Sequence, residues 1–129
     1  MGLKDYFESK QGTGIFATAD PECRVDVAIY AKPLVIDETT IAFVMRQRLS
    51  HQNLKGTMHA AYLFMESGGG YKGKRLYLTK LREEINATLA AAMRKQQPAI
   101  YAEGDDSSKF IVIFHVDRVR PLVGDDPSE

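Results

Sequence analysis

Two arginines and a predicted helix start lie close together in the middle of the chain. Arg46 and Arg48 follow the apolar run Phe43–Met45, and Ser50 begins a short helix that is expected to reach about Lys55. The first turn of a helix has unpaired N–H groups and the positive end of the helix dipole. Guanidinium groups bind phosphate oxygens through paired, charge-assisted hydrogen bonds. The segment therefore suits a phosphate better than any other part of the chain. Taken alone, it is better explained by two solvent-facing arginines beside an ordinary serine N-cap, and only the pattern of the whole chain favours the phosphate site.

A second stretch, Gly68–Lys74, has the glycine and lysine spacing of a phosphate-binding P-loop. A P-loop needs Ser or Thr after the lysine to hold magnesium, and it leads into a helix. Here Arg75 occupies that place, and the residues after it alternate as in a strand. The stretch is therefore interpreted as a glycine-rich hairpin loop.

The histidines indicate neither a metal site nor a catalytic group. His51, His59 and His115 are far apart, with no metal-type pairing at helical spacing. Ser50, His115 and Asp117 could be assembled into a hydrolase triad, but the nucleophile elbow Gly-x-Ser-x-Gly is missing. The sequence thus indicates no catalytic residue and no metal ligand.

Composition narrows the class of protein. The 129 residues predict one domain with a substantial core. The 17 basic residues balance 17 acidic ones, which argues against binding nucleic acid through bulk positive charge. The single cysteine excludes an internal disulfide, and no apolar run is long enough for a membrane span. A cytoplasmic location is expected.

Periodicity predicts a mainly β chain with short helices. Strands are expected at Ile15–Ala19, Val25–Ala31, Leu34–Ile36, Thr40–Met45, His59–Met65, Arg75–Leu81 and Phe110–Val119. Helices are expected at Leu3–Lys10, from Ser50 to about Lys55, and at Ile85–Arg94 with a start at Glu83 or Asn86. The polar tail Gly124–Glu129 is expected to fray. Six or seven short strands joined by short connections favour an antiparallel barrel or sandwich.

Five segments carry a familiar order and spacing: Gly14–Asp20, Val25–Ile29, Val35–Phe43, Arg46–Leu54 and Ala60–Phe64. Together they resemble the pyridoxamine 5′-phosphate oxidase-like family, the FMN-binding split barrels, over about Leu3 to Leu81. The resemblance implies a six-stranded antiparallel split barrel of Greek-key type with short flanking helices. It also implies a homodimer with two FMN sites at its interface.

The same resemblance implies which residues hold FMN. The isoalloxazine ring would lie along the second strand, at Val27, Ala28 and Ile29. The phosphate would be held by Arg46, Gln47, Arg48, Leu49 and Ser50, with Asn53 supporting the turn. In a dimer, the loop Gly68–Gly70 with Tyr71, or the last strand, could reach the partner's ring.

The chain also departs from the family pattern. Leu49 stands where many members have Lys or Arg, and the second strand lacks the basic residues with which the true oxidases bind a phosphorylated substrate. The expectation is therefore an FMN-binding oxidoreductase or electron carrier rather than a pyridoxamine phosphate oxidase. A flavin carries its own redox chemistry, which accounts for the missing catalytic residue. Two alternatives stay open, a haem protein using one of the three histidines and a non-enzymatic binding domain.

Overall fold

The structure, a computed structural model, describes residues 2–46, 49–84 and 109–124, and only the backbone of Arg46, Leu49 and Lys109. In chain order the elements are α1 (Leu3–Ser9), β1 (Gly12–Ala19), β2 (Val25–Ile29), β3 (Leu34–Asp37), β4 (Thr40–Arg46), α2 (Leu49–Gly56), β5 (His59–Glu66), β6 (Gly73–Glu84) and β7 (Lys109–Pro121). Neither of these helices is long and apolar enough to cross a membrane. The predicted helix Ile85–Arg94 and the tail beyond Gly124 lie outside the described residues.

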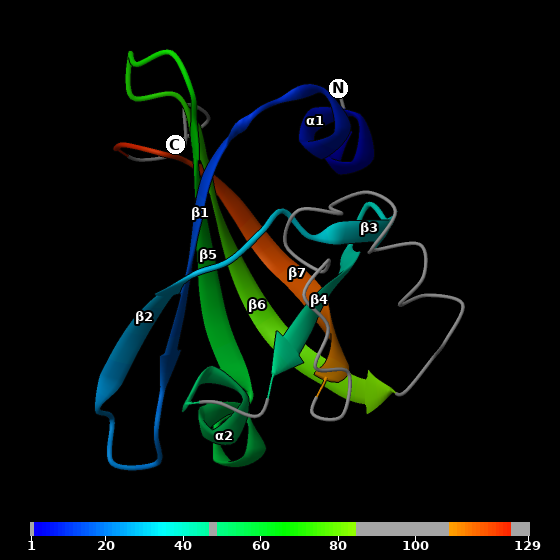
Figure 1. Cartoon of the computed structure of the whole chain (residues 1–129), viewed down its shortest axis with the longest axis vertical. Helices are drawn as coiled ribbons and strands as arrows, with labels where there is room; N and C mark the ends of the chain where they lie inside the picture. Colours follow the sequence, from blue (N-terminus) through cyan, green and yellow to red (C-terminus); the bar gives the residue numbers. More distant parts are fainter. Residues whose placement is uncertain (1, 47–48, 85–108, 125–129) are drawn as a thin grey trace.

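The seven strands form one antiparallel sheet in the order β2-β1-β5-β6-β7-β4-β3 (Figure 1). Strands β1 and β4 are separated by three others in this order. Even so, the rings of Phe16 on β1 and Phe43 on β4 have centroids only 5.0 Å apart. The sheet must therefore curl round on itself, and it stays open between its edge strands β2 and β3.

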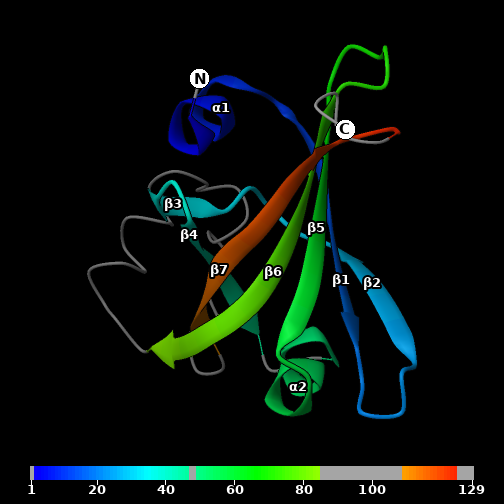
Figure 2. The same cartoon turned by 180° about the vertical axis from the view of Figure 1, so that it is seen from behind.

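The two longest strands produce much of this curl. β6 has 12 residues and β7 has 13, and Figure 2 shows them bending together across the back of the molecule. Their pairing shifts register between Tyr77 and Leu78 and again between Lys80 and Arg82. Such bulges bend the strand and increase its twist, which is how a long antiparallel pair closes toward a barrel.

Aromatic side chains from four strands fill the inside of the barrel. Phe43 is at the centre, with ring centroids 4.9 Å from Tyr62, 5.0 Å from Phe16 and 6.0 Å from Phe114. Helix α1 covers one end, where Phe7 packs edge-on against Phe64 at 5.4 Å. These rings come from inward-facing positions of their strands, as the alternation of a half-buried strand requires.

The prediction of an antiparallel split barrel with short flanking helices is confirmed, with corrections in detail. Seven strands are present rather than six, because Leu34–Asp37 pairs with β4 as an additional edge strand. β1 begins at Gly12 rather than Ile15, because Gly12 and Thr13 pair with Glu66 and Met65 of β5. A Cβ at Gly12 would lie 2.1 Å from the carbonyl oxygen of Met65, which is why the position needs glycine. Glu83 belongs to β6 and does not start a helix.

Candidate functional site

Helix α2 is fixed to the sheet by one buried apolar residue and one buried polar pair. Leu54 is part of the core, and Asn53 Nδ2 donates a 3.0 Å hydrogen bond to Thr18 Oγ1 on β1. Ser50, the second residue of the helix, is buried as well. α2 contacts β1, β2 and β4, so its first turn is held near the point where β4 ends at Arg46.

A second polar cluster holds α2 to the end of β6. His51 Nε2 lies 2.8 Å from Glu83 Oε1, and Lys80 Nζ lies 2.9 Å from the same oxygen. The His51 ring also stacks on Phe110, with centroids 4.0 Å apart and planes 11° apart. Burial raises the pKa of the Glu83 carboxyl, but Lys80 and His51 outweigh burial and hold that pKa below its ordinary value. Glu83 is therefore a carboxylate at neutral pH.

The outward side of the sheet is apolar across three neighbouring strands. We call it the outer apolar face, and it has Val27, Ala17 and Ala61 in one cross-strand row and Ile29, Ile15 and Leu63 in the next. On β2 the exposure is high, at 67% for Val27 and 73% for Ile29. Contiguous exposed apolar surface of this kind marks a site of interaction.

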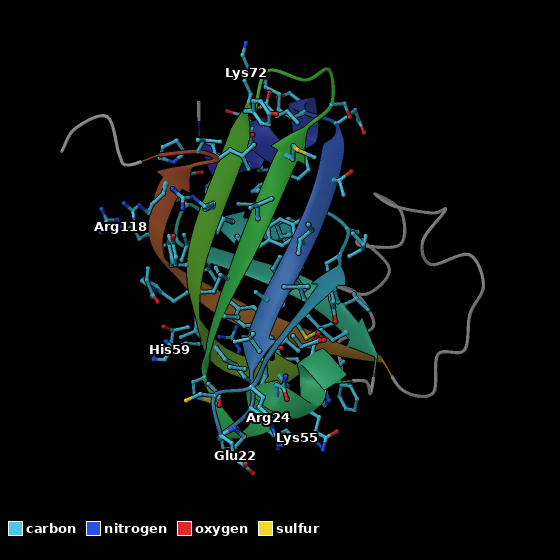
Figure 3. All side chains as sticks on the ribbon, turned by 90° about the vertical axis from the view of Figure 1, so that its left-hand side faces the viewer. Glu22, Arg24, Lys55, His59, Lys72 and Arg118 are labelled. Atoms are coloured by element: carbon cyan, nitrogen blue, oxygen red, sulfur yellow. The ribbon has the colours of Figure 1, made fainter. Side chains whose placement is uncertain are left out.

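Polar and charged side chains lie at the margin of this face, along one side and at both ends. Figure 3 looks onto it, with Arg118 and His59 at one side, Lys72 at one end, and Arg24 and Lys55 at the other end. An apolar centre with a polar margin is the usual anatomy of a protein–protein interface.

A pocket on the described part of the chain is lined by α1 and β3 and by no residue of α2. It has a volume of about 240 Å³ and lies between α1 and the segment that joins β2 to β3, where Phe7, Lys32 and Leu34 line it. Pockets that enclose a cofactor-sized ligand usually measure roughly 300–1,000 Å³. This pocket is therefore smaller than the usual site for a cofactor-sized ligand.

Comparison with known proteins finds relatives by structure alone. No protein-family model and no curated protein match the sequence. An FMN-binding protein from Syntrophomonas wolfei superposes with a TM-score of 0.75 and 14% identity, over 94% of this chain and 84% of that chain. HupZ from Group A Streptococcus gives a TM-score of 0.71 and 16% identity, over 96% of this chain and 94% of that chain. A candidate pyridoxamine 5′-phosphate oxidase from Lactobacillus delbrueckii gives a TM-score of 0.66 and 15% identity, over 92% of each chain.

These superpositions cover nearly the whole chain and follow the same curled sheet. The chain has the pyridoxamine 5′-phosphate oxidase-like split-barrel fold. At such low identity the likeness concerns the fold, so the residues of the site have to be judged from this chain itself. The resemblance found in the sequence is confirmed at that level.

The split barrel brings most of the predicted site residues to one end. Val27 and Ile29 point outward from β2, whereas Ala28 pairs with Phe16 and faces the other side, so a ring on the outer face would meet only its backbone. Arg46 ends β4 and Leu49 begins α2, with Ser50 and Asn53 in that helix. Gln47 and Arg48 lie between these elements, outside the described residues.

Tyr71 is separated from this group within the chain. It is 79% exposed in the loop between β5 and β6, which Figure 1 shows at the opposite end of the sheet from α2. The loop is a hairpin connection, as predicted, and Gly68, Gly69 and Gly70 have positive φ angles that glycine adopts at little cost. Tyr71 has a φ of 51°, an uncommon value for a residue with a side chain.

The split barrel also places polar residues in a row that sequence reasoning missed. Asp117 accepts hydrogen bonds from Thr79 Oγ1 at 2.6 Å and from His115 Nδ1 at 2.7 Å, and His59 Nδ1 lies 3.2 Å from Thr79 Oγ1. Burial raises the pKa of the Asp117 carboxyl, but Thr79 and His115 outweigh it and lower that pKa. The sequence signal for this row was the two-residue spacing of His115 and Asp117, because residues two apart on a strand share a face.

These contacts exclude the Ser50–His115–Asp117 triad considered from the sequence. His115 is hydrogen-bonded to Asp117, but the hydroxyl that contacts this aspartate belongs to Thr79. Ser50 is instead buried in α2. The Thr79 hydroxyl donates to the aspartate instead of to the imidazole, which is the reverse of a nucleophile–base pair. Across the described residues, no three His, Cys, Asp or Glu side chains are grouped so as to hold a metal ion.

Proposed function

We propose that this chain is an FMN-binding flavoprotein, an oxidoreductase or electron carrier, with noncovalent FMN at the interface of a homodimer. One observation carries the proposal. Helix α2, which follows β4 after Arg46, contacts both β4 and the outward apolar strand β2. A dianionic phosphate and a flat apolar ring need these two surfaces side by side.

The β4–α2 junction is suited to the phosphate. The first turn of α2 offers unpaired N–H groups and the positive end of the helix dipole. Arg46 and Arg48 add charge within three residues of that turn. Asn53 holds the helix in place through Thr18, so the donors are preorganised before a ligand arrives.

Strand β2 is suited to the ring. Val27 and Ile29 present branched apolar side chains that exclude water from one face of an isoalloxazine ring. Among the described strands β2 pairs only with β1, so its other edge has backbone N–H and C=O groups available to the polar edge of the ring. When bound, FMN supplies the electron or hydride transfer, and the chain's residues bind and orient it.

The outer apolar face supports the homodimer part of this proposal. In a single chain β2 alone exposes Val25 at 81%, Val27 at 67% and Ile29 at 73%. A second copy packed on this face would cover those side chains and enclose the ring, burying on the order of 2,000 Å². Symmetric pairing of one patch with itself is the commonest route to a dimer.

Binding of FMN is the direct test of the proposal. Protein freed of ligand is expected to bind FMN saturably at micromolar concentrations, followed by the quenching of flavin fluorescence. Purified protein should show the two visible and near-ultraviolet bands of an oxidised flavin. A Soret band would instead favour the haem alternative, and a colourless protein that ignores added FMN would favour a non-enzymatic domain.

Arg48→Ala is expected to weaken FMN binding about tenfold to a hundredfold. A hydrogen bond to a charged group contributes roughly 1.5–3 kcal/mol, which corresponds to that range of affinity. Riboflavin lacks the phosphate, so its affinity should change much less. Both dissociation constants can be measured by fluorescence titration.

Lys55→Ala is the matched control, because Lys55 is an exposed cation at the far end of the same helix. Its loss should leave the affinity for FMN nearly unchanged. Equal losses of FMN and riboflavin affinity in Arg48→Ala would show that Arg48 supports the fold and does not contact the phosphate.

A further inference from the structure

The pocket beside α1 shares no residue with the proposed FMN site. It has a volume of about 240 Å³ and lies between α1 and the segment that leads from β2 into β3. α1 contacts β3, and Figure 1 shows the two elements next to each other. An apolar cavity of about 150 Å³ is enough to bind benzene. The pocket can therefore hold a ring-sized apolar body together with one small polar group.

One wall of this pocket is a single face of α1. Lys4, Phe7 and Glu8 line it, and residues spaced in this way lie on the same side of a helix. Phe7 is buried, whereas Lys4 and Glu8 are exposed. Across the described residues, neither Lys4 nor Glu8 forms an ion pair. Both charges can therefore act on a molecule in the pocket.

The opposite wall carries a cation that is held in place. Lys32 Nζ donates hydrogen bonds of 2.8 Å to the carbonyl oxygens of Phe7 and Lys10, at the C-terminal end of α1. Such carbonyls are the groups that a helix end leaves without an intrahelical partner. Because these bonds fix the ammonium group before a ligand arrives, binding an anion costs little side-chain entropy. Pro33, which is buried, and Leu34 continue this wall with apolar surface.

We propose that this pocket binds a small organic monocarboxylate with an apolar body, at a site separate from the FMN site. The apolar body packs against Phe7, Pro33 and Leu34, which remove it from water. The carboxylate lies toward Lys4 and Lys32. Two lysines against one glutamate, Glu8, leave the lining with one net positive charge, which suits a monoanion and disfavours a second negative group. The inference goes beyond the proposed function and does not depend on it.

Benzoate is the probe for this site, and benzamide, which has nearly the same shape without the charge, is its control. Each is titrated at constant ionic strength into the full isotope-labelled chain, and the backbone amide signals are followed by NMR. Benzoate is expected to shift the amides of Phe7, Lys32 and Leu34 saturably, with a dissociation constant on the order of 1 mM for so small a ligand. Benzamide should bind about three- to tenfold more weakly.

Two substitutions on the same face of α1 should act in opposite directions. Lys4→Ala removes an attractive charge and should weaken benzoate binding about two- to fivefold, whereas Glu8→Gln removes a repulsive charge and should strengthen it by a similar factor. Neither should change the affinity for benzamide. Both residues are exposed, so the fold should tolerate either change. Lys55→Ala, on α2, is the matched control and should bind benzoate like the unaltered protein.

Several results would overturn the inference. Benzoate might leave every amide unshifted, or bind no more tightly than benzamide, and in either case the pocket recognises no carboxylate. Shifts confined to Val27 and Ile29 would mean that the probe binds the outer apolar face instead. Equal losses of benzoate affinity in Lys4→Ala and Glu8→Gln would mean that these residues act through the fold and not through their charge. None of these results bears on the FMN titration, because the two sites share no residue.

Discussion

Ala61→Arg is expected to convert the protein from a dimer into a monomer and to abolish measurable FMN binding. Ala61 lies on β5 in the middle of the outer apolar face, between Ala17 on β1 and Tyr77 on β6. In a dimer the new guanidinium group would meet its own copy across a water-free interface. An unpaired buried charge costs several kcal/mol, which is enough to separate the chains.

The loss of FMN should follow from the loss of the dimer. Ala61 is not among the residues proposed to touch the ligand, so the variant separates assembly from direct contact. Light scattering gives the molar mass, and fluorescence titration gives the affinity for FMN. A monomer of Ala61→Arg that still binds FMN tightly would refute the shared site.

Ile36→Arg is the matched control for this experiment. Ile36 is 45% exposed on β3, the edge strand at the other end of the sheet order from β2. A charge there should leave both the molar mass and the FMN affinity unchanged. Dissociation of the Ile36→Arg dimer would mean that the subunits meet through β3 instead of the outer apolar face.

Phe43→Ala is expected to lower the free energy of unfolding by about 3–5 kcal/mol, the usual cost of removing a buried phenyl ring. Phe43 is 2% exposed and packs against Phe16, Tyr62 and Phe114. It is the ring through which β4 meets β1, so its removal leaves a cavity where the curled sheet closes. Urea unfolding at one fixed protein concentration measures the change, because subunit association adds to the stability of a dimer.

Tyr71→Ala serves as the comparison for this core variant. Tyr71 is 79% exposed, so losing its ring should change the free energy of unfolding by less than about 0.5 kcal/mol. A loss below about 1 kcal/mol in Phe43→Ala would show that the curled sheet is closed chiefly by other contacts.

The sequence by itself determined the local elements and the one site feature that is contiguous in the chain. Alternation of apolar residues placed the strands to within a few residues, because the side-chain period of a strand is a local property. Arg46 and Ser50 could be read as a phosphate site because the same short segment supplies the charge and the helix start. The loop before Arg75 could be distinguished from a P-loop by the residues that follow it, because a P-loop needs a Ser or Thr after its lysine and then a helix.

Only the tertiary structure decided what depends on residues far apart in the chain. Gly12 lay between the predicted helix and the predicted first strand, and its pairing with Glu66 of β5 places it in β1. His51 became a buried group beside Glu83 only when β6 was bent across α2. The outer apolar face likewise needed the pairing of β1 with both β2 and β5. Such pairings are set by long-range packing and register, which local periodicity does not specify.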